Sequence, residues 1–191
     1  MAPINNEIWT DAQDLSTAAR LLEYAWNSYN HVVDIFDKID AKATSLAGFT
    51  GIIMTLSGGL LASGLFSDTN PKEMCAFLAP ISRVLYAIFF SSLSATFAFC
   101  LATLSTRSSA MPSSAAAVVQ KFRNTVPLET REQQVVKDMV NSISIAETSR
   151  RNNNTIKSKH LKHAFASMVA SFIAGITGFA TTLLLKWVNI N

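Results

Sequence analysis

Two clusters of charged and amide side chains, far apart in the sequence, have the residue types needed to bind a small anionic ligand. Acidic residues recur every three positions just before the first apolar run, and basic and amide residues gather just before the last one. Guanidinium and ammonium groups bind anions through charge-assisted hydrogen bonds, and amides both donate and accept. The candidate ligand-binding residues are Asn30, Asp34, Asp37, Asp40, Lys42, Arg150, Asn153, Asn154 and Lys157.

The same residues have a purely structural interpretation. If the two helices that carry them run parallel from one membrane face, the three acids come level with a basic stretch that ends at Lys162. Exposed ion pairs of this kind contribute less than about 1 kcal/mol each. The sequence leaves open whether these charges only hold two helices together or line a ligand cleft near the membrane.

Other residue types that perform chemistry are sparse. His160 and His163 are three apart on a predicted helix, but no acid or cysteine lies in their turn, so we predict no metal site. Cys75 and Cys100 are too few for a disulfide framework. The chain has no G-x-S-x-G, P-loop, H-E-x-x-H or C-x-x-C motif. We therefore predict no catalytic residues, no cofactor and no enzyme activity.

The composition is that of a membrane protein. Only 15% of the 191 residues are charged, and the mean hydropathy is +0.26, whereas soluble domains carry about a quarter charged residues. No charge lies in residues 43–67, 84–106 or 164–185, and each run exceeds the roughly 20 residues that cross a bilayer. The net charge of +3 is best explained by membrane topology, so we expect no nucleic-acid binding.

The basic residues predict the orientation. Ten Lys and Arg residues lie between Arg107 and Lys162 and three before the first span, against two in the first loop and one after the third span. Basic residues mark the cytoplasmic side. We expect a multi-pass protein of the cell (plasma) membrane with a cytoplasmic N-terminus and an outer C-terminus.

Helical periodicity continues outside the apolar runs. Leu15, Leu22, Tyr29 and Phe36 recur every seven residues, and no glycine or proline interrupts Asp11 to Leu46 or Leu128 to His163. The predicted fold is all-α, with three transmembrane helices. Two of them are continuous with long cytoplasmic helices that pair as a parallel helical stalk.

The predicted segments follow from these patterns. The order is a cytoplasmic amphipathic helix 1–42, transmembrane helix 43–67, short external loop 68–83, transmembrane helix 84–106, flexible cytoplasmic linker 107–127, cytoplasmic helix 128–163, transmembrane helix 164–187 and external tail 188–191.

Small residues in the spans predict close helix contacts, because dispersion contact between backbones drives helix association in lipid. We expect the first and third spans to pack through Gly48, Gly51, Ala170, Ala174 and Gly178. The small residues are too many for one seam, so a homo-oligomer is also expected.

The stretch FDKIDAKATSLAGFTGIIMTL, residues 36–56, resembles the entry to the first span in the transmembrane Pycsar effector family. That family has Asp, one residue, Lys, Ala and Ser or Thr, then an apolar run with small residues. The layout of about residues 20–187 is similar too, and SLATT-type membrane effectors share a related helical plan. The residues that carry the resemblance are Asp40, Lys42, Ala43, Thr44, Gly48, Phe49 and Gly51.

The resemblance implies a membrane effector of prokaryotic antiviral defence. In that family a cyclase makes a cyclic pyrimidine nucleotide on phage infection, and the activated effector impairs the lipid bilayer. We expect no added cyclic-nucleotide-binding barrel here, so the nucleotide would bind the cytoplasmic helices themselves. Arg150, Arg151 and Lys157 would then meet the phosphate, and Asn30 or Asn153 the base.

A second interpretation stays open. The chain could be a non-enzymatic membrane scaffold or accessory subunit that binds a protein partner through its cytoplasmic helices. The two interpretations differ in toxicity, because an effector arrests cells when its trigger is supplied and a scaffold does not.

Overall fold

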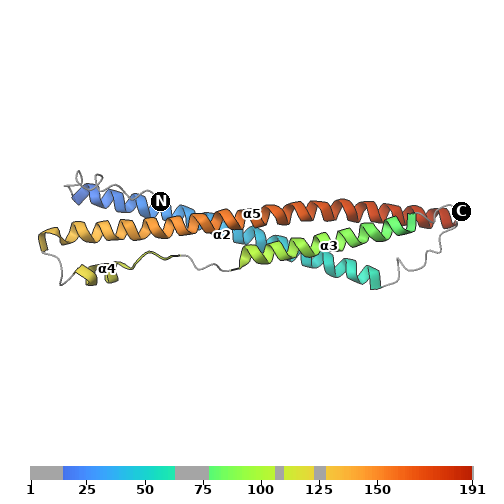
Figure 1. The fold of residues 1–191 in the computed structure, drawn as a ribbon, viewed down its shortest axis with the longest axis horizontal. Coiled ribbons are helices and arrows are strands. Elements are labelled where there is room, and N and C mark those ends of the chain that lie inside the picture. The colour runs from blue at the N-terminus through green and yellow to red at the C-terminus, as the bar shows by residue number, and fades with distance from the viewer. Residues whose placement is uncertain (1–14, 63–77, 106–109, 123–127, 191) are drawn as a thin grey trace. The chain divides into compact units, whose positions relative to one another are not determined.

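A computed structural model describes residues 15–62, 78–105, 110–122 and 128–190. These residues form four helices: α2 (Leu15–Ala62), α3 (Leu78–Leu104), α4 (Ala115–Phe122) and α5 (Leu128–Ile190) (Figure 1). The described part of the chain contains no strand, which confirms the predicted all-α class. The chain divides into two compact units. Unit 1 holds residues 1–38 and 106–155, and unit 2 holds residues 39–105 and 156–191.

Three helices, α2, α3 and α5, are long and apolar enough to cross a membrane, which confirms three candidate spans. α2 has 48 residues and α5 has 63, and each continues unbroken from a polar segment into a charge-free one. An unbroken helix satisfies its own backbone hydrogen bonds, which lipid cannot do. Residues 1–14 of the predicted cytoplasmic amphipathic helix 1–42 lie outside the described residues.

In unit 1, α2 packs against α5 through the apolar stripe that the seven-residue repeat predicts. Tyr29, Ile143 and Ala146 form the buried cluster. Leu22, Ala25 and Val33 pack against it. An amphipathic helix gains stability by burying such a stripe, which stabilises by roughly 25 cal/mol per Å² of apolar surface.

Within the predicted flexible linker 107–127, residues 115–122 form the helix α4. Ser114 starts this helix, and its hydroxyl accepts a hydrogen bond from the backbone N–H of Ala117. The alanines that follow are the best helix formers, and serine is a preferred N-cap residue. Val118 is buried, and Lys121 forms an ion pair with Asp138 of α5. Residues 107–109 and 123–127 lie outside the described parts.

In unit 2, α3 runs antiparallel to α5. The hydroxyls of Ser82 and Thr182 are hydrogen-bonded at 3.0 Å near the start of α3 and the end of α5. At the other end of α3, Cys100 is buried in one cluster with Leu161 and residues of α2. The full buried cluster is Ala43, Leu46, Cys100, Leu161 and Ala164.

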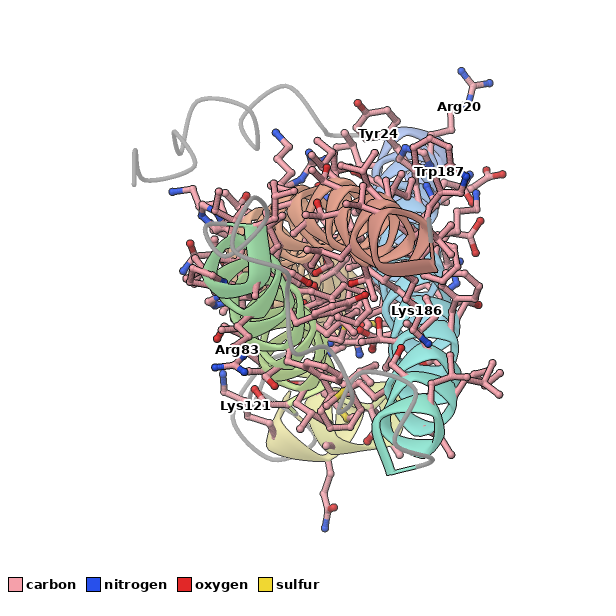
Figure 2. All side chains as sticks on the ribbon, turned by 90° about the vertical axis from the view of Figure 1, so that its right-hand side faces the viewer. Arg20, Tyr24, Arg83, Lys121, Lys186 and Trp187 are labelled. Atoms are coloured by element: carbon pink, nitrogen blue, oxygen red, sulfur yellow. The ribbon has the colours of Figure 1, made fainter. Side chains whose placement is uncertain are left out.

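α3 begins at Leu78, six residues before the predicted span. Residues 78–83, which were expected to end the external loop 68–83, therefore belong to α3. Residues 68–77 lie outside the described parts. Pro80 falls in the first turn, where a missing N–H costs no helical hydrogen bond. Arg83 and Trp187 point away from the helices of unit 2 (Figure 2) and are exposed. Cationic and aromatic side chains of this kind suit the membrane–water interface.

The predicted glycine contacts between the first and third spans are not formed. A Cβ added at Gly48 or Gly51 would meet no atom within 4 Å, and Ala170 is exposed. Ala174 and Gly178 are buried as expected, but the partner of Gly178 is α3, through Leu85 and Tyr86. Small residues show where backbones can approach closely, not which helix approaches.

At Gly175, α5 lies against a side chain of α3. An added Cβ would lie 2.9 Å from Cδ2 of Phe89. We predict that Gly175→Ala lowers the unfolding temperature in detergent relative to Gly51→Ala. Overpacking costs about 1–3 kcal/mol, whereas both variants share the helix-propensity gain of about 1 kcal/mol. Equal unfolding temperatures of the two variants would show that the packing of Phe89 against α5 does not require a glycine at position 175.

Candidate functional site

Hydrogen bonds join the polar faces of α2 and α5 in unit 1. The hydroxyl of Ser28 donates to Glu147 at 2.8 Å, and the amide nitrogen of Asn154 donates to the backbone carbonyl of Val32 at 3.0 Å. Both contacts advance in the same direction along the two helices, which are therefore parallel within this unit. Asn154 is 8% exposed, so its hydrogen bond is made away from water and fixes the local register of α5 on α2.

Arg150 lies on aromatic rings rather than on an acid. Its guanidinium carbon is 5.4 Å from the ring centre of Tyr29 and 5.6 Å from that of Phe36. Cation–π contacts of this kind contribute about 0.5–2 kcal/mol. Glu147 is instead the acid that holds Arg151, at 2.7 Å. Arg150 therefore keeps its positive charge beside an aromatic wall.

Three polar atoms of unit 1 are buried with no hydrogen-bond partner in the described part of the chain. They are Nε of Arg150, Nδ2 of Asn153 and Oδ1 of Asn154. Two are donors and one is an acceptor. A buried polar group without a partner costs about 1–3 kcal/mol, so these atoms make the polar face of α5 unfavourable in this arrangement. They are the atoms of unit 1 best suited to meet a polar ligand.

In unit 2, Lys157 and Asp40 form a buried ion pair. The ammonium nitrogen of Lys157 is 2.7 and 2.9 Å from the two carboxylate oxygens of Asp40. The side chain of Lys157 is 3% exposed and that of Asp40 is 30% exposed. Because the charge of Lys157 is already balanced, this lysine is poorly placed to hold the phosphate of a ligand as well.

Four predicted site residues do not join the buried polar groups of their own units. Asn30, Asp34 and Asp37 of unit 1 and Lys42 of unit 2 are exposed. Asp34 is 4.0 Å from Lys38 one turn later, and both side chains are more than two-thirds exposed. Such a pair contributes about 0.3–0.5 kcal/mol. These four residues behave as a solvated helix surface.

The histidines of unit 2 lie beside an aromatic ring. The ring of Phe99 is 6.4 Å from that of His160 and 5.5 Å from that of His163. Among the described residues, no group of three or more His, Cys, Asp or Glu side chains could hold a metal ion. Both histidine rings therefore contact the ring of Phe99 on α3.

Four contributors to the polar contacts were not predicted: Ser28, Tyr29 and Phe36 on α2, and Glu147 on α5. Tyr29 and Phe36 belong to the sevenfold repeat, which indicated only an apolar stripe. Tyr29 and Phe36 are seven positions apart and lie on one face of α2. A basic residue of α5 at the same height as these rings is the signal that could have predicted the Arg150 contact. Ser28 and Glu147 carry no such signal, because single polar residues are common on helix surfaces.

Comparisons of this chain with protein-family models, with curated proteins and with solved structures find no match. The resemblance to the Pycsar effector family therefore stays a prediction, carried by the residues around Asp40.

The Lys157–Asp40 pair generates a stability prediction. Lys157→Met leaves a partly buried carboxylate without its counter-charge, and we expect a loss near the lower end of about 3–5 kcal/mol in unfolding free energy. Lys38→Met is the matched control and should cost less than about 1 kcal/mol. Denaturant unfolding in detergent, followed by circular dichroism, measures both.

A second variant separates charge from folding defects. Lys157→Met combined with Asp40→Leu should recover most of the loss, since an apolar pair often replaces a buried ion pair without cost. If Lys157→Met is as mild as Lys38→Met, the ion pair does not hold α2 on α5.

Proposed function

We propose that this chain is a membrane effector of prokaryotic antiviral defence that is gated by a cyclic nucleotide at its cytoplasmic helices and impairs membrane integrity. In this proposal α2 and α5 pair as a parallel stalk on the cytoplasmic side and continue into the first and third spans. Three candidate spans and the excess of basic residues between spans two and three support this layout.

The observation that carries the proposal is the partnerless polar face of α5 in unit 1. Arg150, Asn153 and Asn154 bury polar atoms that have no hydrogen-bond partner among the described residues, at a cost of about 1–3 kcal/mol each. A ligand that forms hydrogen bonds with these atoms of α5 stabilises the conformation in which it can reach them. Such differential binding is what a ligand needs to shift a conformational equilibrium.

The chemistry of the face suits a cyclic pyrimidine nucleotide. The guanidinium of Arg150 supplies positive charge for a phosphate, and the aromatic rings beside it offer a surface on which a base can stack. Asn153 Nδ2 can donate to a base carbonyl, and Asn154 Oδ1 can accept from a base N–H. Lys157, which pairs with Asp40, takes a supporting role through that ion pair.

Helix continuity provides the route from ligand to membrane. α5 is one helix from Leu128 to Ile190 and α2 is one helix from Leu15 to Ala62. A change in how these helices pack near Asn153 therefore acts on the segments proposed to cross the bilayer. The open glycine positions Gly48 and Gly51 then leave room for contacts between subunits of a homo-oligomer.

One observation favours the alternative, a membrane scaffold or accessory subunit that binds a protein. Unit 1 has an apolar groove of about 640 Å³, lined in part by Trp26, Tyr29, Met111 and Met139. Aromatic and methionine side chains are enriched at protein interfaces. A scaffold would use this groove and would not arrest cells on addition of a nucleotide.

The proposal predicts nucleotide-dependent loss of membrane potential. We expect cells that express this chain to depolarise when a cyclic pyrimidine nucleotide is supplied, as measured with a voltage-sensitive dye. Asn153→Leu should abolish the response while raising the unfolding free energy by about 1–3 kcal/mol, because it removes a buried donor without a partner. Asn152→Leu, at an exposed neighbouring position, is the matched control.

Two results would contradict the proposal. A full depolarisation response in the Asn153→Leu variant would show that the nucleotide does not bind at this face of α5. No depolarisation with any cyclic nucleotide, while the protein is present in the membrane, would favour the scaffold.

A further inference from the structure

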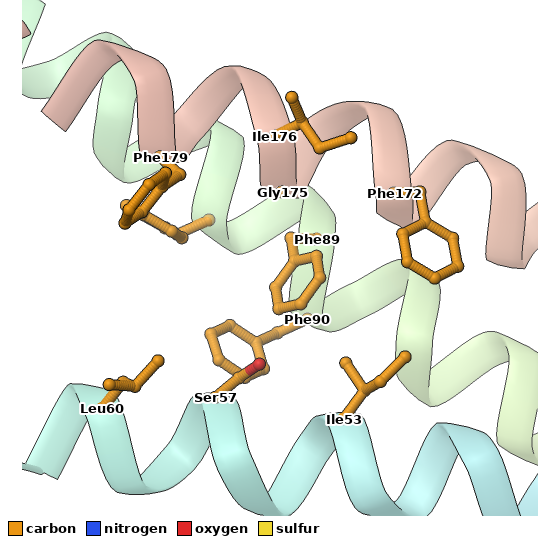
Figure 3. A pocket seen from close by; sticks show the side chains of 10 residues that line it. Ile53, Ser57, Leu60, Phe89, Phe90, Phe172, Gly175, Ile176 and Phe179 are labelled. Atoms are coloured by element: carbon orange, nitrogen blue, oxygen red, sulfur yellow. The ribbon is translucent and has the colours of Figure 1, made fainter. Parts of the chain in front are cut away.

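An apolar cleft of about 350 Å³ lies among the three helices of unit 2 (Figure 3). Aromatic rings from α3 and α5 form its walls, and aliphatic side chains of α2 line its other side. The lining residues on which the argument depends are Ile53, Ser57, Phe89, Phe90, Ile176 and Phe179.

The cleft lies within the charge-free segments of all three candidate spans. In the hydrocarbon core of a bilayer there is no water to fill a space between helices, and a void forfeits the dispersion contacts of the side chains that line it. The surrounding medium consists of acyl chains, and the walls are apolar. The geometry points to a binding site for the acyl chain of a membrane lipid.

The side chains at the cleft favour an acyl chain over a second copy of the protein. Close helix–helix contact in lipid needs small residues, but four phenylalanines line this cleft. The glycines of α2 that would suit a second copy, including Gly48 and Gly51, are not among the lining residues. A slender, flexible hydrocarbon chain fits between large rings where a helix backbone does not.

The polar side chains near the cleft do not call for a polar ligand. The hydroxyl of Tyr86 is already 3.2 Å from that of Thr182 in a hydrogen bond. Phe89, about one turn along α3 from Tyr86, sits against Gly175 of α5, which positions its ring at the cleft. The Ser57 hydroxyl is the other polar group in the lining, and the remaining lining residues are apolar. The occupant therefore needs mainly apolar surface, as the methylene groups of a lipid tail provide.

Photolabelling tests this site without reference to any nucleotide. The full chain is reconstituted in phosphatidylcholine vesicles that contain a phospholipid with a diazirine in its acyl chain, and labelled residues are identified by peptide mass spectrometry. Bulk lipid labels residues according to their exposure. Ile52 is 60% exposed and is not among the residues that line the cleft, whereas Ile53 is half-buried and lines it. A bound acyl chain reverses this order and labels Ile53 more strongly.

Filling the cleft provides the second arm. Ile53→Trp should remove most of the label from Phe89 and Phe90, which line the cleft from α3 and are only half-buried, whereas the matched variant Ile52→Trp should leave it unchanged. Label that follows exposure in the unmodified chain would overturn the site. So would a photo-cross-linking amino acid at position 57 that captures a second copy while the cleft residues stay unlabelled by lipid. Loss of nucleotide gating leaves this result unaffected, because the site depends only on the membrane spans.

Discussion

A buried ammonium group must keep its counter-charge, and the Lys157–Asp40 pair places this constraint on α2 and α5 just before their charge-free segments. Asp40 precedes the buried residue Ala43 by about one turn, and Lys157 precedes the buried residue Leu161 in the same way. A shift of one helix along the other would separate the charges and leave the buried ammonium of Lys157, which is 3% exposed, without its counter-charge. The pair thus fixes which apolar residues of unit 2 meet, whatever its net contribution to stability.

Unit 1 follows a different rule, because its polar groups are only partly satisfied. Asn154 donates to Val32, but its oxygen and two neighbouring polar groups have no partner among the described residues. A chain under pressure for stability alone would replace Asn153 with an aliphatic residue. Its presence at a buried position fits a surface that is completed only when something binds, which is the physical basis of the proposed gating.

The positions of the helices could be predicted from the sequence better than the contacts between them. Charge-free runs and the sevenfold repeat located all three candidate spans and the Leu22 and Tyr29 stripe, because both patterns are local. The acids at positions 34, 37 and 40 were treated as one set, yet successive members are rotated by about 60° on a helix of 3.6 residues per turn. Only Asp40 is paired with a buried base of α5, and Asp34 and Asp37 face solvent. The glycine contacts and the cation–π contacts of Arg150 depend on tertiary packing, which spacing within one helix does not encode.

The central claim is that ligand binding changes the packing of α2 against α5 in unit 1, and a distance measurement tests it most directly. Spin labels on p-acetylphenylalanine at the exposed positions 27 and 152 leave Cys75 and Cys100 unmodified, and pulsed electron paramagnetic resonance in vesicles then reports the separation of the two helices. The account predicts that a cyclic pyrimidine nucleotide shifts the distance distribution, and that Asn153→Leu prevents the shift. An unchanged distribution, at a nucleotide concentration that depolarises cells expressing the same protein, would contradict it.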